Sequence, residues 1–185
     1  MMVGNTAGES GMAFGIANDV KAWKEEQKKG YGSYADRFLE LAAVEKPEDI
    51  GRVIKGIHQM MIKNRALAEL RVRTGKSPAY LYLFDHDLPG NDDGSFHSSE
   101  LWYVFGTVYR CWRPMTGVDY DISDKMVQYW ANFAKTGNPN GEGLPSWEAF
   151  TKENRVNMVL GKEMGCKPIV ETPLQEVTLQ AILGE

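Results

Sequence analysis

Residues 79–84 read Ala-Tyr-Leu-Tyr-Leu-Phe, and this stretch decides the fold. It is short, aromatic and aliphatic, and bounded by Pro78 and Asp85. An apolar run of this length is typical of a strand buried on both faces, and therefore of a sheet covered by helices. The fold class that we predict from it is α/β.

Further elements are predicted on both sides of this run. We expect short strands at residues 1–3, entering a loop at Gly4, and at residues 156–160. We expect helices at 16–29, 34–43, 47–73, 99–105, 121–135 (capped by Asp121) and 177–183. Two or three strands are few for a free-standing α/β sheet.

The composition is that of one globular domain spanning residues 1–185. Hydrophobic residues make up 43% and charged residues 25%, and the formal net charge is −4. The mild acidity disfavours a nucleic-acid partner, and no apolar run is long enough for a membrane span. The first ten residues lack the basic start and apolar stretch of a signal peptide, which favours the cytoplasm but leaves the compartment open.

The two cysteines, Cys111 and Cys166, are interpreted as free thiols, with a single disulfide as the alternative. A disulfide-dense secreted scaffold would carry more cysteines. No C-x-x-C pair is present, so a cysteine zinc site is not expected.

Of the three histidines, His97 has the most suggestive position. His58 lies in a predicted helix and His86 directly follows the central strand, where packing roles are favoured. His97 ends a polar loop just before a helix, and rigid folds place reactive groups on such loops. We therefore single out His97 as a candidate catalytic residue.

The polar loop also permits a metal hypothesis. Asp85-His86-Asp87 and Asn91-Asp92-Asp93 carry ligand types that suit calcium or a transition metal. The spacing does not match an EF-hand, and a solvated acidic loop is the favoured interpretation. We expect no metal and no cofactor, and keep a metal-binding domain as an alternative.

The sequence Gly8-Glu9-Ser10-Gly11 resembles a nucleophile elbow only in part. An elbow needs glycine two positions before and two after the serine, and Met12 stands at the second place. No G-x-S-x-G is present anywhere in the chain. Glu9 is different, because it lies on a glycine-flanked loop a few residues after a strand, a suitable place for an acid that orients a histidine.

Several motifs together resemble the type-B carboxylesterases, the family of cholinesterases and para-nitrobenzyl esterases. The histidine region of that family is similar to Asp93–Leu101 (DGSFHSSEL) followed by YVFG at 103–106. Its late helix and turn are similar to MVQYWANFAKTGNPNG at 126–141, followed by LPSW at 144–147. MVGNTAGESGMAF at 2–14 resembles its strand and acid turn. The resemblance covers nearly the whole chain.

The resemblance implies a fold and two catalytic residues. The fold would be the C-terminal part of an α/β-hydrolase, with few, mostly parallel strands packed against several helices. His97 would be the catalytic histidine and Glu9 the catalytic acid. The acid turn departs from the family pattern, since Gly8 stands where Asp is usual and Ser10 where Gly is usual.

The resemblance also implies what is missing. In the family, the nucleophilic serine and the glycine-rich oxyanion loop precede the acid, and neither is in this chain. We therefore expect the isolated chain not to hydrolyse esters. The expected partners are the N-terminal part of the same esterase, a small carboxylic ester, and a second copy through an exposed sheet edge. A stand-alone binding or scaffold domain is the alternative. Trp102, Tyr103 and Phe105 are interpreted as core residues rather than site lining.

Overall fold

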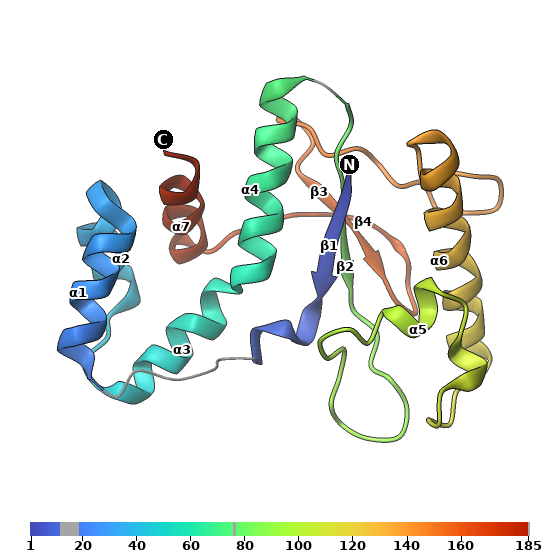
Figure 1. The fold of residues 1–185 in the computed structure, drawn as a ribbon, viewed down its shortest axis with the longest axis horizontal. Helices are drawn as coiled ribbons and strands as arrows, with labels where there is room; N and C mark the ends of the chain where they lie inside the picture. Colours follow the sequence, from blue (N-terminus) through green and yellow to red (C-terminus); the bar gives the residue numbers. More distant parts are fainter. Residues whose placement is uncertain (12–18, 76, 185) are drawn as a thin grey trace. The chain divides into compact units, whose positions relative to one another are not determined.

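The computed structural model describes residues 1–11, 19–75 and 77–184 (Figure 1). The chain divides into two compact units. The sheet unit comprises Met1–Glu9 and Arg71–Ile169, and the helical unit comprises Ser10–Leu70 and Val170–Glu185. Each unit is described by itself, and the interpretation of residues 1–185 as one domain stays a prediction.

The sheet unit is built on four strands in the order β1-β2-β3-β4. They are β1 (Met2–Thr6), β2 (Tyr80–Phe84), β3 (Val156–Leu160) and β4 (Gly165–Pro168). The first three are parallel, as predicted, and β4 runs antiparallel to β3. The register pairs Thr6 with Phe84, and Phe84 with Leu160, so the carboxyl ends of the parallel strands are level.

Helix α6 (Gly117–Thr136) covers one face of this sheet (Figure 1). Its buried stripe packs on alternate residues of the strands, because successive strand side chains point to opposite faces. The short α5 (Leu101–Val104) and the 3₁₀ turn Val108–Arg110 lie next to it. The shared core consists of Tyr80, Phe84, Leu88, Tyr103, Val108, Ile122, Met126, Tyr129, Trp147, Met158 and Leu160.

Two predicted boundaries in this unit were wrong. The first strand continues past Gly4 to Thr6, because residues 2–6 all pair with β2. Glycine fits at position 4, where a Cβ would come within 2.3 Å of the Tyr82 carbonyl oxygen. The helix predicted from Asp121 starts at Gly117 instead. Its cap is Thr116, whose backbone N–H and hydroxyl both donate to Asp119, at 2.7 and 2.9 Å.

The helical unit contains five helices among the described residues. They are α1 (Val20–Tyr31), α2 (Ala35–Ala42), α3 (Pro47–Ile57), most of α4 (Gln59–Thr74) and α7 (Pro173–Leu183). The predicted start of the first helix, Ile16, lies outside the described residues. The core of this unit consists of Trp23, Phe38, Ala42, Val44, Ile50, Val53, Ile57, Ile62, Ala66, Val177 and Leu179.

The single helix predicted over 47–73 is broken at His58. This residue has a φ of +51°, in the left-handed region that histidine adopts more often than most side chains. The break separates α3 from α4 and changes which face is buried. Leu67 and Leu70, although they are apolar residues at helical spacing, are about half exposed in α4. No helix in the described part of the chain is long and apolar enough to cross a membrane.

Candidate active site

Two turns meet at the edge of the sheet where β1 and β2 end. The 3₁₀ turn Ala7–Gly11 follows β1 and carries Glu9. The loop 85–97 follows β2 and ends at His97. Because these strands are parallel and in register, their following turns emerge side by side, which is where open α/β sheets place their ligands.

Gly8 joins the two turns. Its backbone N–H donates to the carbonyl oxygen of Ser95 at 2.9 Å. A Cβ at position 8 would lie 2.6 Å from that oxygen, closer than real side chains approach. Only glycine fits this contact, and this is a physical reason for the departure from the family's Asp.

Glu9 and His97 form a hydrogen-bonded pair. Glu9 Oε1 lies 2.5 Å from His97 Nδ1, and Glu9 Oε2 accepts from the Thr6 N–H at 3.1 Å. The Glu9 side chain is 8% exposed and that of His97 is 53% exposed. Since a carboxylate only accepts hydrogen bonds, Nδ1 carries the proton and Nε2 keeps its lone pair. The arrangement presents an oriented base to the exterior.

The backbone turns sharply directly after His97. Ser98 has a φ of +67°, a left-handed conformation that costs a non-glycine residue free energy. The Ser99 N–H then donates to the Phe96 carbonyl at 3.0 Å, closing a turn around His97. Such outliers persist where surrounding contacts enforce them, and they concentrate at functional sites.

A second carboxylate, Glu100, lies near the pair. Burial raises the pKa of Glu100, and the negative charge of Glu9 adds to this, while His97 opposes it. Its Oε2 is buried without a hydrogen-bond partner among the described residues. The pKa of Tyr82 is raised well above its usual range, first by burial and then by the charges of Glu100 and Glu9. Two carboxyl groups, those of Glu9 and Glu100, therefore lie near the His97 ring.

His86 forms a second histidine–carboxylate pair, with Asp119. Its Nε2 lies 2.9 Å from Asp119 Oδ1, to which the Tyr103 hydroxyl also donates at 2.6 Å. Burial opposes ionisation of Asp119, but hydrogen bonds from Tyr103, Thr116 and His86 outweigh it, so the pKa of Asp119 is lowered. Asp119 was not predicted from the sequence, although the Thr116-x-x-Asp119 spacing is a helix-capping signal.

The acidic loop does not assemble metal ligands. In residues 1–11, 19–75 and 77–184, no group of three or more His, Cys, Asp or Glu side chains is placed to hold a metal ion. The polar side chains of the loop contact protein groups instead. Asn91 donates to the Asp93 carboxylate, and Arg113 donates to Asn91 Oδ1 at 2.5 Å.

The other residues singled out in the sequence analysis are the two cysteines, Ser10 and three aromatic residues. Cys111 and Cys166 are free thiols, and burial raises the pKa of Cys166. The side chain of Ser10 lies outside the described part of the chain, as does Met12. Tyr103 belongs to the core of the sheet unit, as predicted, and Trp102 is partly buried and packs against that core. The prediction was wrong for Phe105, which is 70% exposed.

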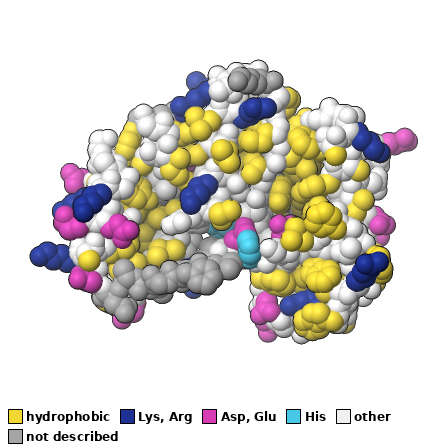
Figure 2. All heavy atoms as spheres, in the orientation of Figure 1, with side chains coloured by type: hydrophobic (Ala, Val, Ile, Leu, Met, Phe, Trp, Pro, Cys, Tyr) yellow, Lys and Arg dark blue, Asp and Glu magenta, His cyan; other side chains and the backbone are white. Residues whose placement is uncertain are grey.

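Exposed aromatic residues follow α5 closely. Phe105, Tyr109 and Trp112 are each more than half exposed. Figure 2 shows yellow hydrophobic side chains with dark-blue cations among them at the lower right, where α5 and one end of α6 lie in Figure 1. Two of the aromatic rings are covered by arginines, Tyr109 by Arg110 at 5.3 Å and Trp112 by Arg113 at 4.9 Å.

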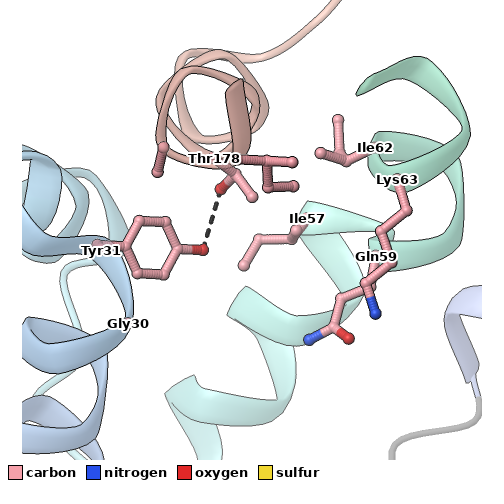
Figure 3. Close-up of a pocket in the computed structure, with 9 residues that line it drawn as sticks. Gly30, Tyr31, Ile57, Gln59, Ile62, Lys63 and Thr178 are labelled. Atoms are coloured by element: carbon pink, nitrogen blue, oxygen red, sulfur yellow. Dashed lines mark hydrogen bonds between the residues drawn. The ribbon is translucent and has the colours of Figure 1, made fainter. Parts of the chain in front are cut away.

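The helical unit contains a pocket of about 270 Å³. In Figure 3, Tyr31 points from α1 toward Thr178 of α7, its hydroxyl 3.1 Å from the Thr178 hydroxyl, and Ile57 points toward Tyr31. Gln59 and Lys63 from α4 add polar groups to its lining. None of the site residues predicted from the sequence lines this pocket.

Comparison with known sequences identifies the family. The model of the carboxylesterase family matches residues 17–177. Carboxylesterase 4A from Bos taurus is 39% identical over 83 residues, which are 42% of this chain and 15% of that protein. Bile salt-activated lipase from Homo sapiens is 36% identical over 107 residues, covering 54% and 14%. Cocaine esterase from Homo sapiens is 35% identical over 97 residues, covering 49% and 17%.

Comparison with solved structures identifies the fold. A thermophilic PNB esterase superposes with a TM-score of 0.72 at 22% identity, covering 95% of this chain and 37% of that one. A second structure of a PNB esterase gives a TM-score of 0.73 with the same coverage. The mixed sheet with its helices is thus part of an α/β-hydrolase fold. The chain spans less than a fifth of these curated relatives and 37% of the solved structures. Because the family model matches most of its residues, the chain belongs to the carboxylesterase family.

Proposed function

We propose that this chain is the C-terminal part of a serine carboxylesterase that hydrolyses carboxylic esters, and that it supplies the base and the orienting acid of a Ser-Glu-His triad. The observation that carries the proposal is the pair of Glu9 and His97. The buried carboxylate holds Nδ1 at 2.5 Å, and the half-exposed ring leaves Nε2 open to the exterior.

The proposed mechanism rests on proton chemistry. A serine hydroxyl is too weak an acid to attack an ester unaided. His97 Nε2 takes the proton of that hydroxyl as the oxygen attacks the ester carbon, and later gives it to the leaving alcohol. Glu9 keeps the proton on Nδ1 and stabilises the imidazolium between these steps. Glu100 adds negative charge near the same ring.

The nucleophile has to come from another part of the esterase. The 185 residues contain no G-x-S-x-G. We propose that the partner of this chain is the N-terminal part of the same enzyme, bearing the serine and the oxyanion loop. Backbone donors of such a loop contribute about 2.7–4 kcal/mol each to lowering the barrier. Without them, the isolated chain does not turn over esters.

Hydrolysis of 4-nitrophenyl acetate tests the proposal in two settings. The isolated chain is expected to show no saturable turnover above that of its His97→Ala variant. The complete esterase, in which this chain is continuous with a part carrying G-x-S-x-G, is expected to be active and to lose activity on His97→Ala. Saturable, His97-dependent turnover by the isolated chain would contradict the division of the triad. Full activity of the complete His97→Ala enzyme would favour a non-catalytic scaffold role.

The open edge of β1 supports the same proposal. Among the described strands, β1 pairs only with β2, which leaves its other edge unpaired. Unpaired edges recruit further strands. We propose that a strand of the N-terminal part occupies this edge in the complete enzyme, and that a second copy occupies it in the isolated chain. Light scattering is expected to show a dimer, and a monomer at high concentration would contradict this.

A further inference from the structure

We propose that Arg113 is a positioning residue, whose guanidinium holds the loop 89–96 in the conformation that brings His97 to Glu9. The inference rests on the proposed function, because it assigns Arg113 a part in presenting the base. Arg113 lies between the 3₁₀ turn Val108–Arg110 and α6, and its side chain is only 6% exposed.

The guanidinium contacts the loop at three polar positions. One terminal nitrogen donates to the Pro89 carbonyl at 3.1 Å and to Asn91 Oδ1 at 2.5 Å. The other lies 3.5 Å from Asp93 Oδ2. Asn91 itself donates to the Asp93 carboxylate. Arg113 therefore contacts every second residue along this part of the loop, at Pro89, Asn91 and Asp93.

The flat face of the guanidinium contacts the end of the loop that adjoins the base. Its central carbon lies 5.1 Å from the ring centroid of Phe96, the residue directly before His97. It also lies 4.9 Å from the ring centroid of Trp112, which is 78% exposed. One side chain thus reaches from Pro89 to Phe96.

The loop needs such anchoring, because its backbone has no regular structure. At its start, the Asp85 N–H donates to the Leu160 carbonyl, and near its end Ser95 accepts from Gly8. Between these two points, Gly90 has a φ of +105°. A Cβ there would lie 3.1 Å from Pro114, so Gly90 lets the loop run close beneath the segment that carries Arg113.

Lysine cannot replace arginine at this position. The contacts use the planar fork for two directions of donation and the flat face for stacking on Phe96. A lysine ammonium offers one point charge and no face. Arg113→Lys is therefore expected to behave like Arg113→Met rather than like the wild type.

The tautomer of His97 tests the proposal in the chain itself. Nitrogen-15 NMR distinguishes a ring protonated at Nδ1 from one protonated at Nε2. Above neutral pH, the wild type is expected to show a single Nδ1–H tautomer for His97. Arg113→Met and Arg113→Lys are expected to show both tautomers in exchange. Arg110→Met is the matched control, because Arg110 lies over Tyr109 in the same segment, and it is expected to keep the single tautomer.

Two further measurements keep the test decisive. Asn91→Ala removes one exposed partner of Arg113. In the folded chain, it is expected to give a smaller fraction of the Nε2–H tautomer of His97 than Arg113→Met gives. Circular dichroism checks the fold of every variant. A single Nδ1–H tautomer in both folded Arg113→Met and Asn91→Ala would overturn the proposal, as would a tautomer mixture in Arg110→Met.

The complete esterase separates this inference from the proposed function. There, Arg113→Met is expected to lower kcat by about 10- to 100-fold, since small displacements of a catalytic group carry penalties of that order. If Arg113→Met mixes the tautomers while His97→Ala leaves the esterase fully active, the positioning by Arg113 stands and the assigned function of His97 falls. If His97→Ala abolishes activity while Arg113→Met changes neither the tautomer nor kcat, the function stands and the positioning falls.

Discussion

Two histidine–carboxylate pairs lie in the described part of the sheet unit, and they differ in which ring nitrogen the carboxylate contacts. Glu9 holds Nδ1 of His97, and the ring is 53% exposed. Asp119 holds Nε2 of His86, and the two side chains are 13% and 3% exposed. A hydrogen bond to a carboxylate is therefore not enough to identify a histidine as a catalytic base. The far nitrogen must also be able to reach a substrate.

The difference arises from where each histidine lies along the loop after β2. His86 is the second residue after β2 and lies against Tyr103 from α5 and Asp119 from α6, so its pair joins the loop to the helices. His97 stands at the far end of the same loop, where the turn after β1 brings Glu9 against it and its side chain stays 53% exposed. The substitutions Glu9→Gln and Asp119→Asn distinguish the catalytic role of the first pair from the structural role of the second.

The largest expected effect is on activity. In the complete esterase, Glu9→Gln removes the acceptor that fixes the His97 tautomer, and kcat is expected to fall about 10⁴-fold, as for the equivalent change in a serine protease. Asp119→Asn is expected to change kcat less than about tenfold under conditions where the enzyme is folded, because Asp119 does not touch His97. Steady-state kinetics measure both, and equal losses would contradict the comparison.

For stability, Asp119→Asn is expected to have a larger effect than Glu9→Gln. Asp119→Asn leaves the buried Tyr103 hydroxyl and His86 with a weaker acceptor, and is expected to lower the free energy of unfolding by about 1–3 kcal/mol. Glu9→Gln is expected to cost less than about 1 kcal/mol, because the amide oxygen still accepts from Thr6. Urea unfolding followed by tryptophan fluorescence measures both changes. A larger loss for Glu9→Gln would show that the Glu9 pair is the structural one.

The Asp119 network also predicts a pH dependence. The pKa of Asp119 is lowered in the folded state, so its contribution to stability is fully present above the unfolded pKa, about 3.9. The contribution is lost as pH falls through the lowered pKa. The stability difference between wild type and Asp119→Asn is therefore expected to narrow on acidification. The exposed Asp121→Asn serves as the control, and a difference that widens below about pH 4 would contradict the sign.

The smallest expected effect concerns Glu100. Burial raises its pKa in the folded state, so the ionised form costs stability above the unfolded pKa of about 4.3. Glu100→Gln is expected to stabilise the chain slightly at pH 7, and so to raise its Tm. This gain in stability is expected to disappear below about pH 4, where the glutamic acid of the wild type is neutral like the glutamine of the variant. Calorimetry at the two pH values measures it, with Glu153→Gln as an exposed control; a loss at pH 7 would refute it.

The sheet was predictable from the sequence because its first three strands are short apolar runs. The strand β4 was not, because Gly165–Pro168 carries no apolar pattern and is a strand only through its pairing with β3. The break at His58 was missed for a related reason. Apolar residues continue at helical spacing on both sides of it, and the left-handed φ of one residue leaves no trace in that spacing.

The candidate site was predictable in part. Loop placement and the family resemblance named Glu9 and His97, and the structure places Glu9 Oε1 beside His97 Nδ1. Arg113 was not foreseen, since it contacts residues 17–24 positions earlier through a fold-dependent approach. Asp119 lies 33 positions from His86, and local patterns do not encode such pairings.

The contact between Gly8 and Ser95 has a consequence for engineering by family consensus. The resemblance to the family implies Asp at position 8, so a library designed to follow the family pattern would place Asp here. In this backbone the new Cβ would meet the Ser95 carbonyl at 2.6 Å and displace the turn that ends at His97. The choice of residue at position 8 therefore depends on the conformation of residues 94–96. In a designed variant the two should be exchanged together or both left unchanged.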